Sequence, residues 1–349
     1  MKGTDAVQGI FLNIDVQLSS QAFRKMYNLR TLITKYEDSD EDCNEDCDDE
    51  SDEVYDEDCE EVHLHNGDLD YLPDELRYLH WKMYPLEILP SVFNPVNLVE
   101  LDISRSNIKQ LWKGRTCVPK LKRLNLGDCE KLISIPDLSD IPSAESINLK
   151  RCISLLEIHS SRERPKKLHS LRLSDCKNLS RFPSNIHIEG SEFSLHLLPP
   201  LSGLCSLKEL RLNNSSLTEI SEDIGCLSSL EKLELHGNVF ERLPKSIKQL
   251  SKLYYLSLYN CGMLRSLPEL PSSLRFLEAM NCKELIQSLP DESEIELCAN
   301  GGGSFIFNFM NCLKLNQKAV SNLFRDSLLK MQLMGTEKII SLFKVSPPP

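Results

Sequence analysis

The sequence predicts an α/β solenoid, a fold in which short parallel strands stack one behind another. The pattern Leu-x-x-Leu-x-Leu-x-x-Cys runs from Leu121 to Cys129 and returns from Leu168 to Cys176 and from Leu253 to Cys261. The first apolar positions of successive units are Leu76, Leu98, Leu121, Ala144, Leu168, Leu207, Leu230, Leu253 and Leu274. All but one of the steps between these positions are 21 to 24 residues long. Since so short a unit cannot bury its own apolar side, it must stack on its neighbours to be stable.

This period and this apolar spacing are typical of the leucine-rich repeat. We therefore expect a curved horseshoe with a parallel sheet on its concave side, irregular returns on its convex side and a short helical cap at the C-terminal end. Within one unit, an alternation of period two points Leu101 and Ile103 into the core. The same alternation points Glu100, Asp102 and Ser104 out onto the concave face.

The ninth position of the unit carries a small, weakly polar residue that faces the turn backbone after the strand. Its occupants are Ser106, Cys129, Cys152, Cys176, Ser215, Asn238, Cys261 and Cys282. Because this position also takes serine and asparagine, which cannot form a disulfide, we interpret the five cysteines as buried structural thiols.

The repeats occupy only part of the chain. We expect a linker and first repeat over residues 1–36, an acidic disordered insertion over 37–61, and repeats over 62–290. A linker over 291–304, marked by three glycines, then leads to a post-repeat segment over 305–349. In that segment, apolar residues at helical spacing between Gln317 and Met334 predict the cap.

The acidic insertion accounts for the net charge of −12. Residues 37–61 hold 17 Asp and Glu and no Lys or Arg, which leaves 40 basic and 35 acidic residues elsewhere. A calcium site is disfavoured because the tract lacks the glycine and the final spaced glutamate of an EF-hand loop. We interpret it as a tolerated loop insertion, with an acidic interaction arm as the alternative.

One step is anomalous, because 39 residues separate Leu168 from Leu207. The excess stretch, residues 186–200, is either a loop bulging from the return side or a decayed repeat. We favour an irregular repeat that weakens the stack locally, since Pro199 and Pro200 are incompatible with an interior strand.

The sequence points to a reducing compartment and away from catalysis. Its start has no signal-peptide core, and no stretch approaches the ~20 apolar residues of a membrane span. Thirteen cysteines without a secretory signal favour the cytoplasm, and the nucleus is compatible as well. Phosphate-binding, kinase and hydrolase motifs are absent, so we expect no enzyme, no cofactor and no metal site, with His63 and His65 capable only of adventitious metal binding.

Five segments resemble parts of plant TIR-NB-LRR disease resistance proteins in and around their repeat region. Residues 72–90 and 97–114 are similar to the segment that opens the repeats of that family. Residues 3–12 with 22–30 resemble its link to the nucleotide-binding region, and Phe309–Gln317 resembles its post-repeat segment. The resemblance covers essentially the whole chain.

The resemblance implies the sensor part of an immune receptor, which binds proteins in plant defence signal transduction. In the family, the TIR domain cleaves NAD and the NB-ARC domain binds ADP or ATP, but neither matches any residue of this chain. We therefore expect the purified chain to consume neither NAD nor ATP. The alternative is a leucine-rich-repeat scaffold or ubiquitin-ligase adaptor unrelated to immunity, which would need an F-box-like segment that residues 1–36 do not show.

The outward positions of the strands predict the binding surface. Basic residues gather in the middle repeats and aromatic ones in the late repeats, and the candidates are Arg123, Lys150, Arg172, Arg211, Lys232, His236, Tyr255, Tyr259, Phe276 and Met280. Exposed aromatics near arginine are typical of interface hot spots. The competing interpretation is that aromatics simply suit a strand surface or lie under the C-terminal segment.

We expect the partner to be a protein: a pathogen effector, a guarded host protein or the nucleotide-binding domain of a receptor. These would compete for overlapping parts of the concave face. A basic excess of only five charges outside the acidic tract is too small for a nucleic-acid-binding protein, so we expect no nucleic acid partner.

Overall fold

The computed structural model describes residues 6–13, 18–35, 69–158, 165–179, 204–286, 306–312 and 314. The acidic insertion over 37–61, the excess stretch 186–200, the linker 291–304 and the predicted helical cap over 317–334 lie outside these residues.

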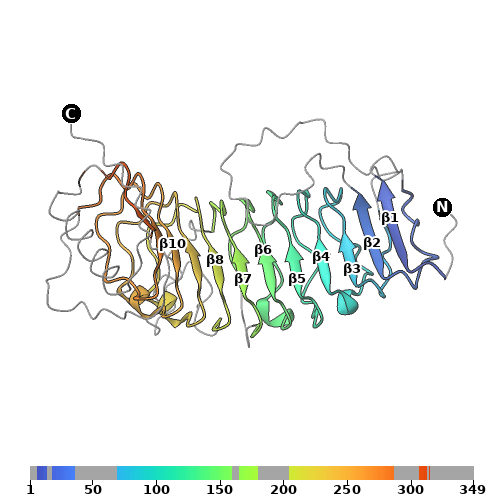
Figure 1. Ribbon diagram of the computed structural model, residues 1–349. Helices are drawn as coiled ribbons and strands as arrows, with labels where there is room; N and C mark the ends of the chain where they lie inside the picture. Colours follow the sequence, from blue (N-terminus) through green and yellow to red (C-terminus); the bar gives the residue numbers. More distant parts are fainter. Residues whose placement is uncertain are drawn as a thin grey trace, which may run out of the picture.

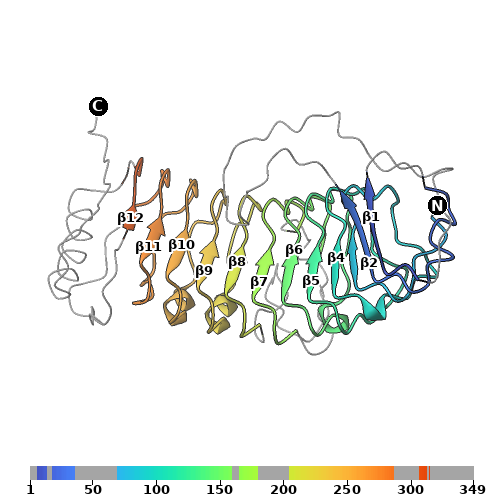
Figure 2. The ribbon, with the colours of Figure 1, turned by 45° about the vertical axis from the view of Figure 1, so that its right-hand side comes forward.

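The structure is a single row of parallel strands that follow one another in chain order from β1 to β12 (Figures 1 and 2). The strands are β1 (Gly9–Asn13), β2 (Thr31–Lys35), β3 (Tyr78–His80), β4 (Glu100–Asp102), β5 (Arg123–Asn125), β6 (Ser146–Asn148), β7 (Ser170–Arg172), β8 (Glu209–Arg211), β9 (Lys232–Glu234), β10 (Tyr255–Ser257), β11 (Phe276–Glu278) and β12 (Ile306–Asn308). This arrangement confirms the predicted leucine-rich-repeat solenoid.

The strand register aligns the apolar positions of the repeat along one spine. Leu124 pairs with Ile147, and Ile147 pairs with Leu171, so the same inward position recurs at each rung. All three side chains are buried in one continuous core that runs from Ile10 to Phe309. Each rung therefore buries its apolar side only because the next rung covers it.

The sheet extends beyond the repeats that we recognised in the sequence. Strand β1 pairs with β2 over five residues, within the stretch 1–36 that we assigned to a linker and the first repeat. Strand β12 pairs with β11 within the segment 305–349 that we placed after the repeats. The pattern was present at both ends: Val7, Ile10 and Leu12 have the repeat spacing, and Phe307, Phe309 and Cys312 have its second half.

The anomalous step of 39 residues does not interrupt the sheet. Ser170, Leu171 and Arg172 of β7 pair directly with Glu209, Leu210 and Arg211 of β8. The ladder continues past the strands, since the Leu173 amide donates to the Arg211 carbonyl at 2.8 Å. The strand ladder is therefore continuous across this step, and the expected irregular repeat over 186–200 lies outside the described residues.

The returns are made of turns and short 3-10 helices, and no α-helix occurs among the described residues. The helices are η2 (Pro95–Asn97), η3 (Leu138–Asp140), η4 (Glu222–Cys226) and η5 (Lys245–Gln249). Ser221 caps η4 by accepting a hydrogen bond from the Asp223 amide. Neighbouring returns also cap each other, because the Glu222 carboxylate accepts hydrogen bonds from the amides of Lys245 and Ser246 at 3.0 and 2.8 Å.

Each strand from β3 to β12 is followed by a turn with a residue in the left-handed region at the same position of the unit. These ten residues have φ between 52° and 67°: Met83, Arg105, Asp128, Arg151, Asp175, Asn214, Gly237, Asn260, Asn281 and Asn311. Asn, Asp and Gly tolerate this conformation, and they hold seven of the ten positions. The late asparagines also form a ladder, in which Asn281 donates to Asn260 and Asn311 donates to Asn281, both at 2.8 Å.

From Cys129 onward, the next residue, at the ninth position of the unit, donates a hydrogen bond to a carbonyl of the preceding rung, whereas Ser106 donates to the Ser104 carbonyl of its own rung. The Cys129 thiol donates to the Ile103 carbonyl at 3.2 Å, and the Cys152 thiol donates to the Leu126 carbonyl at 3.1 Å. Ser215 and Asn238 make the equivalent bond with oxygen and nitrogen donors at 2.9 and 2.8 Å. Cysteine, serine and asparagine interchange here because each supplies a small donor to a buried carbonyl.

Burial and hydrogen bonding confirm that the cysteines of the ninth position are structural thiols. Burial raises the pKa of Cys129, Cys176 and Cys261 to about 12, so almost no thiolate forms near neutral pH. In contrast, Cys117, Cys205 and Cys226 are exposed.

We expect iodoacetamide at pH 8 to alkylate Cys117, Cys205 and Cys226 in the folded protein and to spare Cys129, Cys152 and Cys176. Mass spectrometry of tryptic peptides after native labelling would measure this, with urea-unfolded protein as the control in which all six react. Equal labelling of the two groups in the folded protein would contradict the assignment.

Candidate functional site

The concave face consists of the side chains that point outward from the strands, and the register arranges them in columns. The first column holds Glu100, Arg123, Ser146, Ser170, Glu209, Lys232, Tyr255 and Phe276. The second column holds Asp102, Asn125, Asn148, Arg172, Arg211, Glu234, Ser257 and Glu278. Both are the columns that the repeat spacing predicts.

A polar network covers the early part of this face. Arg123 pairs with Glu100 of the preceding rung, and His80 lies 3.3 Å from the other oxygen of the same carboxylate. Burial lowers the pKa of His80, against the opposing effect of Asp102. Asn125 then donates to Asp102, and Asn148 to Asn125, both at 3.0 Å. Arg123 is therefore exposed but already paired.

Arg211 is not an accessible binding residue, contrary to our expectation. Its side chain is only 8% exposed and its Nε lies 3.3 Å from Oε1 of Glu234, whose side chain is 5% exposed. Asn213 also donates to Glu234 at 3.0 Å. The register that brings Arg211 beside Glu234 thus turns a predicted contact residue into a structural one.

The other predicted basic residues lie at the surface of the middle repeats. Lys150 is exposed, whereas Arg172 is half-buried. Lys232 is half-buried and lies 3.6 Å from Glu209 of the preceding rung. Such exposed or partly exposed pairs contribute little stability, so these cations remain able to exchange partners.

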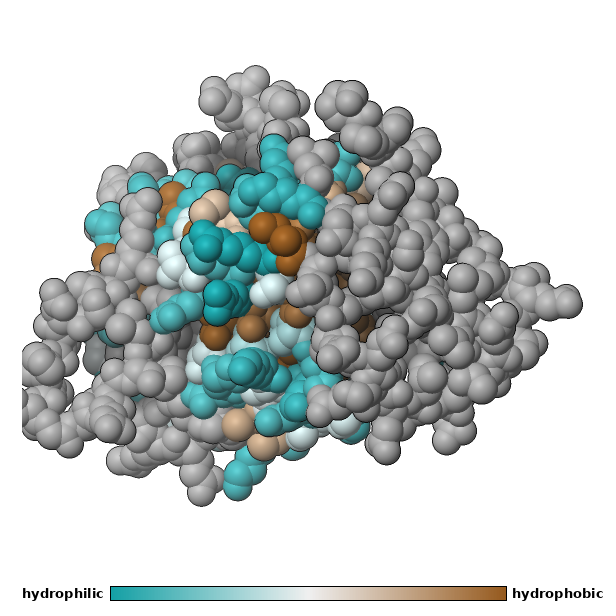
Figure 3. Space-filling model, turned by 90° about the vertical axis from the view of Figure 1, so that its left-hand side faces the viewer, coloured by the Kyte–Doolittle hydropathy of each residue, from teal (hydrophilic) through white to brown (hydrophobic). Residues whose placement is uncertain are grey.

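The late aromatic patch, which we define as Tyr255, Tyr259, Phe276 and Met280, comes together as predicted. Strands β10 and β11 place Tyr255 directly beside Phe276, and all four side chains are half-buried. The His236 ring lies 6.3 Å from the Tyr259 ring. Figure 3 views the molecule from this C-terminal end and shows hydrophobic side chains among hydrophilic ones where grey atoms do not cover them.

Two residues beside the late aromatic patch were missed as site residues. Tyr254 packs edge-on against Phe276, with ring centroids 6.4 Å apart. Glu278 accepts a hydrogen bond from the Tyr255 hydroxyl at 2.8 Å, and this bond, after burial, helps to raise the pKa of Tyr255. Both could have been read from the repeat spacing. Glu278 belongs to the second column, and Tyr254 directly precedes Tyr255 of the first column.

The N-terminal end of the concave face has apolar residues that we also missed. Phe11 of β1 pairs in register with Ile33 of β2, and its side chain is 61% exposed. Tyr78 of β3 lies one rung further and is exposed as well. Recognition of β1 as a rung would have revealed them.

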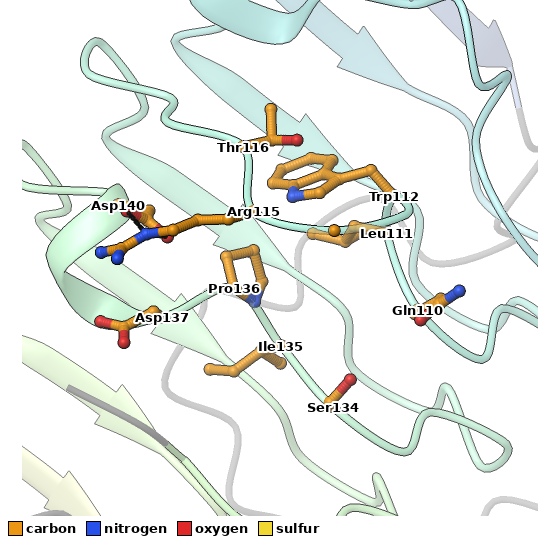
Figure 4. A pocket seen from close by; sticks show the side chains of 11 residues that line it. Gln110, Leu111, Trp112, Arg115, Thr116, Ser134, Ile135, Pro136, Asp137 and Asp140 are labelled. Atoms are coloured by element: carbon orange, nitrogen blue, oxygen red, sulfur yellow. Dashed lines mark hydrogen bonds and ion pairs between the residues drawn. The ribbon is translucent and has the colours of Figure 1, made fainter. Parts of the chain in front are cut away.

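A cavity of about 400 Å³ lies on the return side, between residues 110–116 and 134–140. Figure 4 shows Arg115 reaching across its mouth to Asp140, and Nε of Arg115 lies 2.9 Å from both carboxylate oxygens. Asp137 accepts hydrogen bonds from the amide and hydroxyl of Ser139. Since its charged groups are already paired with protein atoms, we assign this cavity no function.

Neither a metal site nor a membrane-spanning helix is present among the described residues. No group of three or more His, Cys, Asp and Glu is placed to hold a metal ion in the described ranges. Within the same ranges, no helix has the length and apolar character that crossing a membrane requires.

The relatives of this chain are plant disease resistance proteins. Disease resistance protein RPP2A of Arabidopsis thaliana is 37% identical over 272 residues, which cover 77% of this chain and 18% of the relative. RML1A of the same plant is 32% identical over 94% of this chain and 33% of its own length. TMV resistance protein N of Nicotiana glutinosa is 31% identical over 66% of this chain and 21% of its own length. The chain thus spans a fifth to a third of these relatives.

Comparison with solved structures finds leucine-rich-repeat proteins. The repeat domain of the type III effector XopL aligns over 68% of this chain and 70% of that domain, with 20% identity and a TM-score of 0.43. No family model matches the sequence. The fold assignment therefore rests on the strand register of the chain, and the family assignment rests on the curated relatives. The chain is a leucine-rich-repeat region of the plant TIR-NB-LRR disease resistance protein family.

Proposed function

We propose that this chain is the protein-binding sensor module of an intracellular plant immune receptor, and that it recognises a pathogen effector or a guarded host protein. The observation that carries the proposal is the late aromatic patch, in which Tyr255, Tyr259 and Phe276 lie half-buried on the concave face. Rigid aromatic side chains beside polar ones are the composition of interface hot spots. The family relation supports a role in defence, and we place the protein in the cytoplasm, where such receptors act.

The mechanism that we propose is competition for the concave face. An effector, a guarded host protein and a nucleotide-binding domain would occupy overlapping parts of it, so that one partner displaces another. The exchangeable cations of the middle repeats, Lys150 and Lys232, would set the orientation of the partner, while the aromatic side chains would supply most of the affinity.

The test is the triple variant Tyr255→Ala/Tyr259→Ala/Phe276→Ala, compared with wild type in co-immunoprecipitation against a panel of effectors and host proteins. We expect loss of the bound partner, because truncating hot-spot aromatics costs about 2–4 kcal/mol each. The matched control is Ile133→Ala/Leu156→Ala/Val239→Ala, which removes exposed apolar side chains from the returns. Circular dichroism melting curves must show that both variants fold. Partner binding that survives the aromatic substitutions, or is lost equally in the control, contradicts the proposal.

A further inference from the structure

The late aromatic patch lies around the carboxylate of Glu278, which has no cation beside it among the described residues. Glu278 lies in β11, and its side chain is half-buried. Its carboxylate accepts the hydroxyl of Tyr255, and it forms no ion pair within the described part of the chain. One neutral donor leaves most of the acceptor capacity of an ionised carboxylate unused.

The same column shows how this chain satisfies such a group two rungs earlier. Glu234 is paired with Arg211, which occupies the equivalent position on the preceding rung. The rung that precedes Glu278 carries Ser257 at that position, and a serine side chain is neutral, so it cannot form an ion pair with Glu278. A guanidinium from another molecule could therefore form with Glu278 the ion pair that Arg211 forms with Glu234.

The side chains around Glu278 suit the same cation. The outward positions of β10 and β11 contain no lysine or arginine, so the charge of Glu278 is not offset there. Tyr255 and Phe276 lie beside it in the first column, and Tyr259 lies on the other flank of β10. Aromatic faces attract guanidinium groups, and more strongly when water is partly excluded.

We propose that the late concave face binds an arginine side chain that protrudes from the protein partner. Glu278 pairs with the guanidinium, and the rings of Tyr255, Tyr259 and Phe276 contact its faces. Arginine fits better than lysine because its planar fork pairs with a carboxylate while it stacks on rings. This inference rests on the proposed function, since it names the chemistry of the partner at that surface.

The probe is a pair of capped tripeptides, Gly-Arg-Gly and Gly-citrulline-Gly, which share shape but differ in charge, because the neutral urea of citrulline has a carbonyl oxygen where the guanidinium has a nitrogen donor. They would be titrated into the full chain carrying ¹³C-labelled methionine methyl groups, with the Met280 resonance as the reporter. We expect the arginine peptide to shift this resonance saturably, with a dissociation constant on the order of 1–10 mM. The citrulline peptide should bind at least about tenfold more weakly, because it cannot form the charge-assisted bond.

Three variants complete the test, and one of them is its control. Glu278→Gln should weaken the arginine peptide about tenfold, since it keeps the shape of the side chain but removes its charge. Glu219→Gln removes an exposed carboxylate on a return and should change nothing. Tyr255→Phe keeps the ring and removes the hydroxyl that occupies Glu278, so the arginine peptide should bind it at least as well as wild type.

Three results would overturn the inference: equal binding of both peptides, wild-type binding by Glu278→Gln, or no response of Met280 at the solubility limit. None of these bears on whether a protein binds the concave face. If the aromatic triple variant still loses its protein partner, the proposed function stands and only the arginine assignment fails. If it retains the partner, the proposed function fails instead.

Discussion

Replacing Leu233 with Ala is expected to lower the free energy of unfolding by about 2–5 kcal/mol. Leu233 is fully buried in β9, where it pairs in register with Leu210 of β8 and Leu256 of β10. Its truncation therefore opens a cavity toward both neighbouring rungs, and a solenoid has no other layer that could collapse into the space. Urea unfolding followed by circular dichroism would measure the loss.

The control for this substitution is Val239→Ala. Val239 lies on a return and is 45% exposed, so its truncation should change the unfolding free energy by no more than about 0.5 kcal/mol. If the two variants lose similar stability, the central stack does not depend on contacts between rungs in the way the register indicates.

The second large effect is expected for Arg211→Met, which should cost about 3–5 kcal/mol because it leaves the Glu234 carboxylate buried without its cation. The two side chains are 8% and 5% exposed, which places them far from the solvent screening that weakens surface pairs. Adding Glu234→Gln should recover most of the loss, since it removes the buried charge and keeps an acceptor for Asn213. Urea unfolding of the single and the double variant, compared with wild type, would test this.

An exposed ion pair on the same rungs provides the comparison. Lys208 lies 3.1 Å from Glu231, and their side chains are 57% and 36% exposed. Lys208→Met should therefore cost less than about 1 kcal/mol. A loss for Arg211→Met as small as that for Lys208→Met would show that Glu234 is hydrated in the folded protein.

The repeat spacing predicted the parts of the fold that depend on local pattern. The inward spine through Leu124, Ile147 and Leu171 and both outward columns followed from a period of two within the strand and about 23 residues between strands. The ninth-position thiols were predictable as well, because cysteine shares its position with serine and asparagine.

The accessibility of a side chain on the concave face was not predictable, because it depends on the neighbour one rung away. Arg123 and Arg211 occupy strand positions of the same kind, yet one is exposed and the other is buried against Glu234. To predict that Arg211 pairs with Glu234, one must know which residues of neighbouring strands lie side by side and how deeply they are buried. The sequence of a single strand shows neither. Glu278 was missed for the same reason. Its importance depends on the preceding rung, which carries Ser257 where an arginine could have paired with its carboxylate.

The strand β1 escaped recognition for a different reason. Val7, Ile10 and Leu12 fit the pattern, but a unit with valine and isoleucine in place of leucine is weak when it is read alone. Its partner β2 makes it a strand, since Ile10 lies beside Leu32 and both are buried.

The direct pairing of β7 with β8 shows that the length of a return and the spacing between strands can vary independently. A return that contains the 39-residue step advances the sheet by a single rung, as does a return of ordinary length. The number of residues between two strands can therefore change while the outward side chains keep their regular spacing, which forms a lattice from rung to rung. Homologous receptors that differ in length at this point can present the same lattice to a ligand, and a reporter sequence inserted between Leu179 and Leu204 would leave it undisturbed.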